Sequence, residues 1–363
     1  MPNLFDPTII NGMELQNRFV RSATWDATAD DDGFVTDTSV ELYKTLGRGN
    51  IGLVVSGYAF VSLIGKAAVR QYGIHSDDMI PGLRRIVEAV HQGGSRIALQ
   101  IVHAGSQVTF LNPKPDIEVL AVSKRSDISA IHREMTEEDI QKVISEFGEA
   151  ALRGKEAGFD AVQLNGVHGY LFSQMHSPLL NKRTDRWGGT AENRRRFHLE
   201  VIREIRKLVG DDFPVMIKYG IRDYSEEGLT LKEGLETARL LVEAGIDAIE
   251  ISFNTMKNVA ITPKQGEPER AYFRDWTAAA KKAVDIPIIL VHGVRSIELA
   301  RDVLERGDAD LIAMCRPFVR EPNLVQRWAK GDTSPAKCIL CNKCLGITLR
   351  GEPIECADER VKQ

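Results

Sequence analysis

Three polar side chains that could act on one ligand follow the apolar residues 161–164. Asn165, His168 and Tyr170 lie within six positions of one another. Asn165 and His168 can donate hydrogen bonds to a single ligand oxygen, and the phenol of Tyr170 can give up a proton. Polar residues in such turns more often cap a helix than catalyse a reaction. The place of this segment in the whole chain therefore decides between the two interpretations.

Eight short apolar runs recur along the chain, and each run ends in small or polar residues. They cover residues 19–23, 53–56, 97–102, 161–164, 215–218, 248–252, 286–291 and 311–314. Their continuous Val, Ile and Leu content is typical of strands that are buried on both faces of a parallel sheet. The segment that carries Asn165 thus follows the fourth of eight predicted strands.

Segments with helical spacing lie between these runs. The predicted helices cover residues 81–90, 136–157, 190–208, 230–244 and 296–306, and Gly245 and Gly307 stand where C-terminal caps are expected. A doubly wound sheet would be the alternative fold, but neither its glycine-rich fingerprint nor a P-loop sequence occurs. The alternation therefore predicts an α/β fold, a (β/α)8 TIM barrel over residues 1–330, with a Cys-rich extension over residues 331–363.

In a barrel of this kind the active site lies at the carboxyl ends of the strands. This rule favours a functional role for Asn165, His168 and Tyr170. Gly293 follows the seventh strand and Arg316 the eighth, where such barrels commonly bind phosphate. A surface ion pair is the alternative role for Arg316. Two long connections, residues 104–135 and 172–189, are expected to cover the mouth of the barrel.

Composition limits the classes of partner. The chain has 363 residues, 43% apolar and 27% charged, with a net charge of −4, which is typical of a globular protein and gives no reason to expect nucleic acid or an anionic membrane. The sequence contains neither a run long enough to span a membrane nor a secretory signal. Four of five cysteines lie near the carboxyl end, which disfavours a disulfide scaffold. We expect a cytoplasmic homo-oligomer that acts on a small molecule.

Several segments resemble the old yellow enzyme family over residues 3–330. They are residues 4–7, 15–18, 99–105, 168–171, 177–185, 188–189 and 192–194. The resemblance implies an FMN-dependent oxidoreductase that takes its electrons from NAD(P)H. It also implies cofactor-binding roles for Ser22, Ala23, Thr24 and Gly57 against the flavin ring, for Gln100 and Lys218 at its pyrimidine side, and for Gly293, Cys315 and Arg316 at the phosphate.

The same resemblance implies a catalytic mechanism. Asn165 and His168 would bind the carbonyl oxygen of an activated alkene, hydride would pass from the flavin to the β-carbon, and Tyr170 would protonate the α-carbon. Three positions depart from the family pattern. The substrate pair reads Asn then His, Lys218 replaces the more common Arg, and Cys315 replaces Gly. These departures leave the preferred substrate open.

The extension carries four thiols with the spacing of a metal site. Cys338, Cys341 and Cys344 are separated by two residues each, and Cys356 follows. Such a set can hold a [4Fe–4S] cluster or zinc, and free thiols or a disulfide are the alternatives. The segment is similar to that of the branch containing trimethylamine dehydrogenase and the bacterial 2,4-dienoyl-CoA reductases, although the last gap is slightly short. Since the chain ends seven residues after Cys356, a cluster would need a partner subunit or be a remnant.

Three functions are compatible with this sequence. The first is an ene-reductase for α,β-unsaturated carbonyl compounds, acyl-CoA thioesters included. The second is a flavin dehydrogenase or demethylase that passes electrons through the cluster to an electron-transfer partner protein. The third is a flavin-free barrel lyase or isomerase with a phosphorylated substrate. In the first two we expect the barrel's strand ends to bind the flavin without help from the extension.

Overall fold

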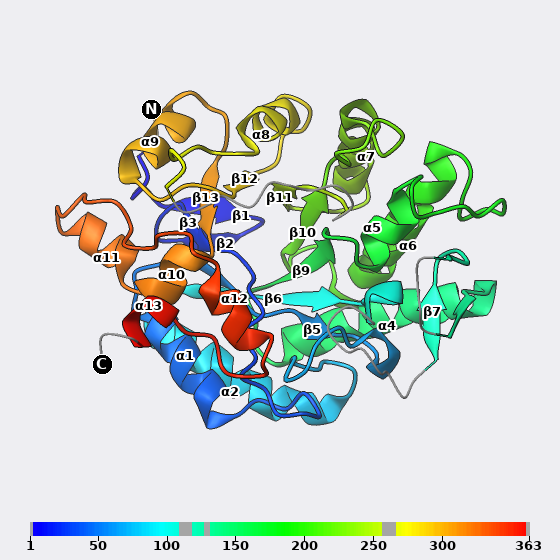
Figure 1. The fold of residues 1–363 in the computed structure, drawn as a ribbon, viewed down its shortest axis with the longest axis horizontal. Helices are drawn as coiled ribbons and strands as arrows, with labels where there is room; N and C mark the ends of the chain where they lie inside the picture. The colour runs from blue at the N-terminus through cyan, green and yellow to red at the C-terminus, as the bar shows by residue number, and fades with distance from the viewer. Residues whose placement is uncertain (1–2, 109–117, 127–130, 256–265, 361–363) are drawn as a thin grey trace.

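Eight parallel strands form a closed barrel in the computed structural model, which describes residues 3–108, 118–126, 131–255 and 266–360 (Figure 1). The strands are β3 (Phe19–Arg21), β4 (Leu53–Val55), β6 (Arg96–Val102), β9 (Ala161–Gly166), β10 (Val215–Gly220), β11 (Ala248–Ser252), β12 (Ile288–Val291) and β13 (Leu311–Met314). Each strand pairs with the next in this order, and β13 pairs back with β3. The predicted TIM barrel is confirmed, with every predicted strand within two residues of its observed bounds.

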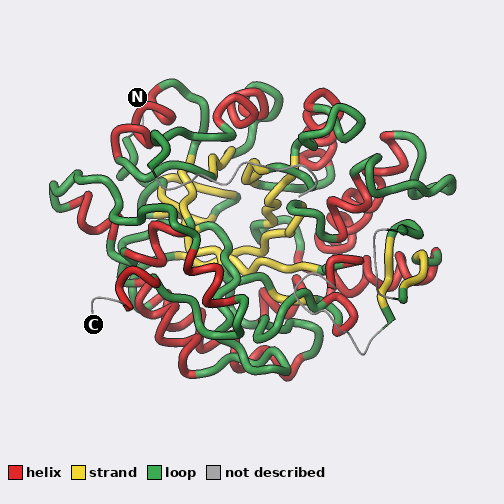
Figure 2. Tube along the Cα trace, viewed as in Figure 1, coloured by secondary structure: helices red, strands yellow, loops and turns green. Residues whose placement is uncertain are grey.

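Helices surround the strands, as Figure 2 shows. They include α1 (Asp37–Gly47), α2 (Ile80–His91), α4 (Glu137–Glu156), α6 (Ala191–Val209), α7 (Leu231–Glu243), α8 (Arg274–Lys281), α9 (Ile297–Glu305) and α11 (Leu324–Ala329). All five predicted helices are confirmed. The helices α1 and α8 were not predicted. In α8 three of the four apolar residues are alanines, which give only a weak helical period.

Helix ends follow the predicted capping chemistry. Thr136 accepts from the backbone N–H of Asp139, whose side chain accepts in return from the Thr136 N–H, so the predicted capping box starts α4. Gly245 and Gly307 have φ angles of 114° and 71°. Each glycine directly follows the C-cap residue of its helix, and its left-handed backbone conformation ends the helix.

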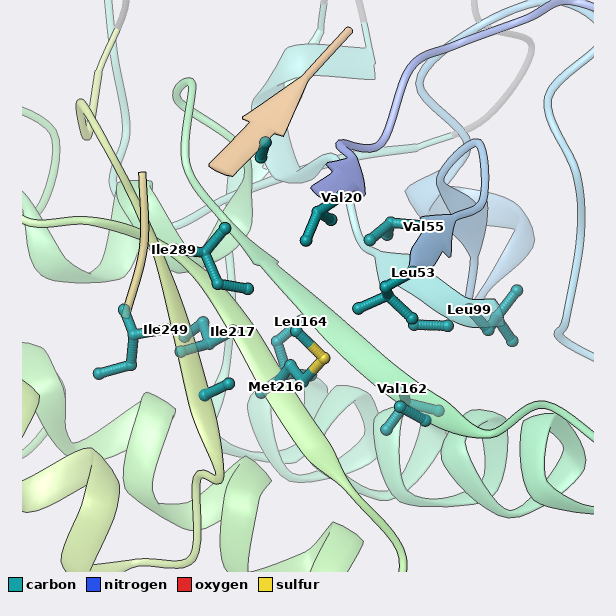
Figure 3. Close-up of a cluster of buried hydrophobic side chains, with 14 of the residues drawn as sticks. Val20, Leu53, Val55, Leu99, Val162, Leu164, Met216, Ile217, Ile249 and Ile289 are labelled. Carbon is teal, nitrogen blue, oxygen red and sulfur yellow. The ribbon is translucent and has the colours of Figure 1, made fainter. Parts of the chain in front are cut away.

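The strands bury large aliphatic side chains, several of which Figure 3 labels. Leu99 and Val162 are fully buried, and both lie against Gly154 of α4, where a Cβ atom would stand 3.1 and 3.3 Å from them. Successive strand residues point to opposite faces of a sheet. The neighbours Gln100 and Gln163 therefore point into the barrel, where they form a hydrogen bond to each other.

Smaller elements extend the barrel. They are a hairpin of β1 (Thr8–Ile10) and β2 (Met13–Leu15), the short strand β5 (Ala59–Phe60), the pair β7 (Val119–Ala121) and β8 (His132–Glu134), and α5 (Leu171–His176). The described parts of the predicted insertion 104–135 pack against Tyr170 through Val108 and Val119. Residues 109–117 and 127–130 of that insertion lie outside the described residues. No helix among the described residues is long and apolar enough to cross a membrane.

The carboxyl-terminal extension lies across the barrel, as the orange and red ribbons of Figure 1 show. After α10 (Arg316–Arg320) and α11, it forms α12 (Lys343–Thr348) and α13 (Ala357–Arg360). The N–H of Ala336 donates to the carbonyl of Arg295 at 2.8 Å, and that of Ile354 donates to the carbonyl of Asp26 at 2.8 Å. The extension is thus bonded to strand-end loops at opposite ends of the sequence.

Candidate active site

A cavity of about 350 Å³ opens at the carboxyl ends of β12 and β13. Of the predicted site residues, its lining includes Thr24, His168, Gly293, Cys315, Arg316 and Cys344. The extension supplies a further part of the wall, including Leu340, Asn342 and Ile354. Long-range backbone hydrogen bonds hold the extension over the strand ends, so it forms part of this wall. That the strand ends bind flavin without help from the extension stays a prediction.

One end of the cavity has the character of a phosphate site. Gly293 has a φ of 105°, and a Cβ atom there would stand 2.0 Å from the carbonyl oxygen of Arg270, so only glycine fits. Arg316 is the first residue of α10, and its guanidinium donates to the side-chain oxygen of Asn342. The N–H groups of Arg295 and Ser296 donate to Glu269. The backbone at Gly293 and the guanidinium of Arg316 remain in the cavity wall to meet an anion.

Amide side chains form a continuous hydrogen-bonded chain inside the barrel. Asn165 Nδ2 donates to Gln100 Oε1 at 3.1 Å, and Gln100 Nε2 donates to Gln163 Oε1 at 2.7 Å. Gln163 Nε2 then donates to Glu250 Oε2 at 3.0 Å. All four side chains are buried. The predicted residues Asn165 and Gln100 are thus brought together, although they come from different strands.

A buried ion pair ends this chain. Lys218 Nζ lies 2.9 Å from Glu250 Oε1 and donates to Ser22 Oγ at 2.8 Å, while Ser22 in turn donates to Glu250. Burial by itself lowers the pKa of Lys218, but the charge and the hydrogen bond of Glu250 outweigh it, and the pKa is raised overall. Lys218 therefore carries its positive charge at neutral pH.

The β3 and β4 ends meet beside this pair. Thr24 Oγ1 donates to the carbonyl of Ser22 at 3.1 Å, and half-buried Ala23 lies between these two residues. A Cβ atom at Gly57 would stand 2.9 Å from Asp26 Oδ2 and 3.2 Å from the carbonyl of Thr24. The glycine therefore permits a close approach of the two strand ends, whose residues are predicted to lie against the flavin ring.

His168 and Tyr170 follow β9, and His168 has a left-handed backbone conformation. His168 has a φ of 61°, its Nε2 lies 3.3 Å from Ser252 Oγ, and its ring lies 4.6 Å from that of Phe253. Burial, followed by the charge of Lys218, lowers the pKa of His168 well below its usual value, so the imidazole is neutral. Burial raises the pKa of Tyr170, so its phenol keeps its proton. The pair offers a neutral donor and a proton source.

Seven of the residues predicted to be catalytic or to bind the cofactor lie outside the lining of this cavity. They are Ser22, Ala23, Gly57, Gln100, Asn165, Tyr170 and Lys218. Four of these share the buried network described above, and Tyr170 packs instead in an apolar cluster with Tyr58. The structure therefore separates a cofactor-sized cavity from a polar layer beneath it, with His168 in the cavity wall.

Sequence reasoning missed four residues of this region: Tyr58, Gln163, Glu250 and His292. The alternation of strand side chains could have indicated two of them, because Gln163 is two positions before Asn165 and Glu250 is two positions before Ser252. His292 has a φ of 85°, lines the cavity and precedes Gly293, just as His168 precedes Gly169. The repeated His-Gly pair could have indicated that His292 belongs to the site.

The four cysteines of the extension line a second, smaller cavity of about 20 Å³. Arg316, Asn342 and Cys344 belong to the walls of both cavities. All five cysteines are free, and burial raises the pKa of Cys338 and Cys344. Within the described residues no three His, Cys, Asp or Glu side chains are arranged to hold one metal ion. The thiols are gathered as predicted, but a metal would require them to rearrange.

The fold is a TIM barrel whose cavity has a glycine turn after β12 and a guanidinium after β13, beside the buried Lys218–Glu250 pair. The profile of the NADH:flavin oxidoreductase / NADH oxidase family matches residues 3–334, and the chain belongs to this family. This confirms the predicted resemblance to the old yellow enzymes. The cofactor of the family is FMN, with NADH or NADPH as the reductant.

Individual relatives agree with this assignment. The chain is 34% identical to an NADH oxidase of Thermoanaerobacter brockii, over 95% of this chain and 54% of the relative. It is 33% identical to an NADPH dehydrogenase of Geobacillus sp. (strain WCH70), over 88% of this chain and 91% of the relative. A solved 2-naphthoyl-CoA reductase complex superposes with a TM-score of 0.91 at 28% identity, over 98% of this chain and 56% of that one. The chain spans about half the length of the first curated relatives it matches.

Proposed function

We propose that this chain is an NAD(P)H-dependent FMN ene-reductase that reduces the C=C bond of an α,β-unsaturated carbonyl compound. The observation that carries the proposal is the segment after β9, where a buried amide, a neutral imidazole and a protonated phenol lie within six residues. These three groups match the two needs of the reaction, which are hydrogen bonds to a carbonyl oxygen and a proton for carbon.

The residues around the cavity fit FMN. Gly293, Cys315 and Arg316 would hold the phosphate, because they combine a glycine-only turn with a guanidinium in one wall. The ring would lie over the polar layer. Gln100 and Lys218 would contact its pyrimidine side, against a wall of Ser22, Ala23, Thr24 and Gly57. Bound FMN supplies hydride transfer between the nicotinamide and the alkene.

Asn165 and His168 would bind the substrate's carbonyl oxygen. The oxygen gains negative charge as the β-carbon accepts hydride, and a preorganised donor is typically worth about 3 kcal/mol to such a step. His168 can act as a neutral donor because burial disfavours its protonation. Tyr170 would donate its phenolic proton to the α-carbon, and solvent would then reprotonate the phenolate. One hydride and one proton thus add across the double bond.

The likeness to the 2-naphthoyl-CoA reductase supports a conjugated thioester as one substrate class. The test is a spectrum followed by two half-reactions. Purified protein reconstituted with FMN should show flavin absorbance that NADH or NADPH bleaches and that an enone or an enoyl thioester restores. A protein that takes up no FMN would contradict the proposal and favour a flavin-free barrel enzyme.

We also infer a metal site at Cys338, Cys341, Cys344 and Cys356, with [4Fe–4S] ahead of zinc. Support comes from the cavity the four thiols share and from its common wall with the larger cavity. A cluster so placed suits electron transfer to a partner protein. The free thiols suit a reducing compartment, as in cytoplasm. Leu345 and Leu349 of α12, each 53% exposed, support a homo-oligomer, which light scattering of the purified protein would test.

A further inference from the structure

We propose that Glu250 is the positioning residue of this active site. It fixes the direction of the amide chain that ends at Asn165, and it balances the positive charge of Lys218. The proposal rests on the proposed function, since it assigns the effect of this carboxylate on the flavin and on the substrate's oxygen. It follows from the place of Glu250 at the junction of the ion pair and the amide chain, where the side chain is completely buried.

The carboxylate determines which way Gln163 and Gln100 point, while Asn165 Oδ1 also accepts from the backbone N–H of Val167 at 3.4 Å. An ionised carboxylate accepts hydrogen bonds and donates none, so Gln163 must present its Nε2 to Glu250. Gln163 Oε1 then faces Gln100, which must present its own Nε2, and Gln100 Oε1 accepts from Asn165. Each amide uses one N–H group along this chain and keeps a second. The second N–H groups of Gln100 and Asn165 are therefore fixed as donors for the flavin and the substrate.

The same carboxylate sets the charge beneath the flavin. Lys218 Nζ lies 2.9 Å from Glu250 Oε1, and both side chains are buried, so the pair is weakly screened by solvent. A lone ammonium would stabilise the negative charge of the reduced flavin strongly. The ion pair stabilises that charge less, because the carboxylate opposes it. Glu250 thus holds the flavin's reduction potential below the value that Lys218 alone would give.

Replacing Glu250→Gln tests both roles in one protein of nearly unchanged shape. The single oxygen of the new amide will be drawn to the ammonium of Lys218, so its NH2 group will face Gln163. Gln163 must then turn over, and the reversal passes to Gln100, whose Nε2 comes to face Asn165 Nδ2. Because the Val167 N–H holds Asn165 Oδ1 in place, Asn165 loses its acceptor. We expect phenol-type ligands, which bind through an anionic oxygen, to bind about threefold to tenfold more weakly.

The midpoint potential of the bound flavin gives the second readout. Loss of the opposing carboxylate should favour the reduced flavin about tenfold, which is ~30 mV upward for a two-electron couple. Gln163→Met separates the roles, because it interrupts the amide chain but keeps the ion pair. This variant should lose affinity for the phenol and keep its potential. If Glu250→Gln fails to fold, the Gln163→Met variant still tests the role of Glu250 in setting the direction of the amide chain.

Asp247→Asn is the matched control. Asp247 lies directly before β11, at the end opposite the site, where it pairs with Arg206 and accepts from the N–H of Val215. The same change from carboxylate to amide there should alter neither the potential nor phenol binding. An FMN-loaded Glu250→Gln protein with unchanged potential and phenol affinity would overturn this inference alone. A wild-type protein that binds no FMN would overturn the proposed function with it.

Discussion

The ring of Tyr58 lies 5.8 Å from the ring of Tyr170, centroid to centroid, with the two planes inclined at 44°. Both belong to an apolar cluster that includes Val102 and Val108. Burial raises the pKa of each phenol, and the interaction with Tyr58 partly offsets this rise at Tyr170. The proton donor proposed for the α-carbon therefore has a second phenol beside it, which orients it.

Tyr170→Phe should separate the two half-reactions. We expect reoxidation of the reduced flavin by an enone to slow by roughly 10²–10⁴-fold, because a positioned acid typically contributes that much. Reduction by NAD(P)H should stay near normal, since no carbon is protonated in that step. Tyr58→Phe is the control, with a smaller loss because the acid itself is kept. Stopped-flow absorbance measures both rates, and equal loss in the two half-reactions would reject the role of Tyr170.

Arg316→Ala should lower the affinity for FMN about tenfold to a hundredfold, the worth of a charged hydrogen bond. Flavin reactivity at saturating FMN should be unchanged, because a phosphate contact positions the cofactor without altering its ring. Fluorescence titration of the deflavinated protein gives the dissociation constant. Since Arg316 also donates to Asn342, the Asn342→Ala variant shows how much of the loss comes from that bond. FMN retained by Arg316→Ala through extensive dialysis would contradict the assignment.

Gly293→Ala should impair FMN binding through the backbone. The glycine has a φ of 105°, and an added methyl group would stand 2.0 Å from the carbonyl of Arg270, so the turn must shift. Gly331→Ala is the matched control, because that glycine also has a positive φ of 97° but no atom lies within 4 Å of its would-be Cβ. Both variants are strained, and we expect lost FMN affinity only for Gly293→Ala. Equal affinities in a flavin titration would remove Gly293 from the phosphate site.

A buried histidine pair should make the fold acid-sensitive. The rings of His176 and His198 lie 5.0 Å apart, and neither ring nitrogen of His198 has a hydrogen-bond partner among the described residues. Burial lowers the pKa of His198 to about 3, below the unfolded value of about 6.5. Between these values the unfolded chain binds a proton that the folded chain does not, so stability falls as pH falls below about 6.5.

His198→Phe should therefore reduce the loss of stability in acid. At pH 5 the wild-type protein should have lost about 2 kcal/mol through this residue relative to pH 8. Between pH 8 and pH 5 the variant should lose about 2 kcal/mol less folding stability than the wild type. Above pH 7 the stabilities of the two proteins should depend on pH in nearly the same way. Urea unfolding at pH 5 and pH 8 measures the difference. Parallel pH profiles for the two proteins would show that His198 is protonated equally in both states.

Cys341→Ser tests the metal site. If the four thiolates hold a [4Fe–4S] cluster, anaerobically purified protein should contain about four irons and four sulfides per chain, and the variant should lose them. Because the extension forms part of the cavity wall, loss of the metal should also weaken FMN binding. Iron and sulfide analysis and flavin titration measure both. If the analysis finds one tightly bound zinc and no iron, the site holds zinc and the cluster is rejected. Metal-free protein with four alkylatable thiols would reject both the cluster and the zinc.

Much of the fold could be predicted because its signals are local. A strand buried on both faces, such as β11 or β13, must be a continuous apolar run, and both were predicted with their observed bounds. The capping box at Thr136 is likewise a local pattern. Asn165, His168 and Tyr170 were predicted by the same route, since barrel topology fixes which strand ends face the site.

The sequence by itself determined the barrel, its family and the cluster of polar residues after β9. Only the tertiary structure decided that Lys218 pairs with Glu250 and that Ile354 bonds to Asp26, which stands 328 positions earlier. The physical reason is that alternation along a strand tells which side chains point inward, but not which ones meet. The register between strands and the path of the extension set those contacts, and both depend on packing between distant parts of the chain.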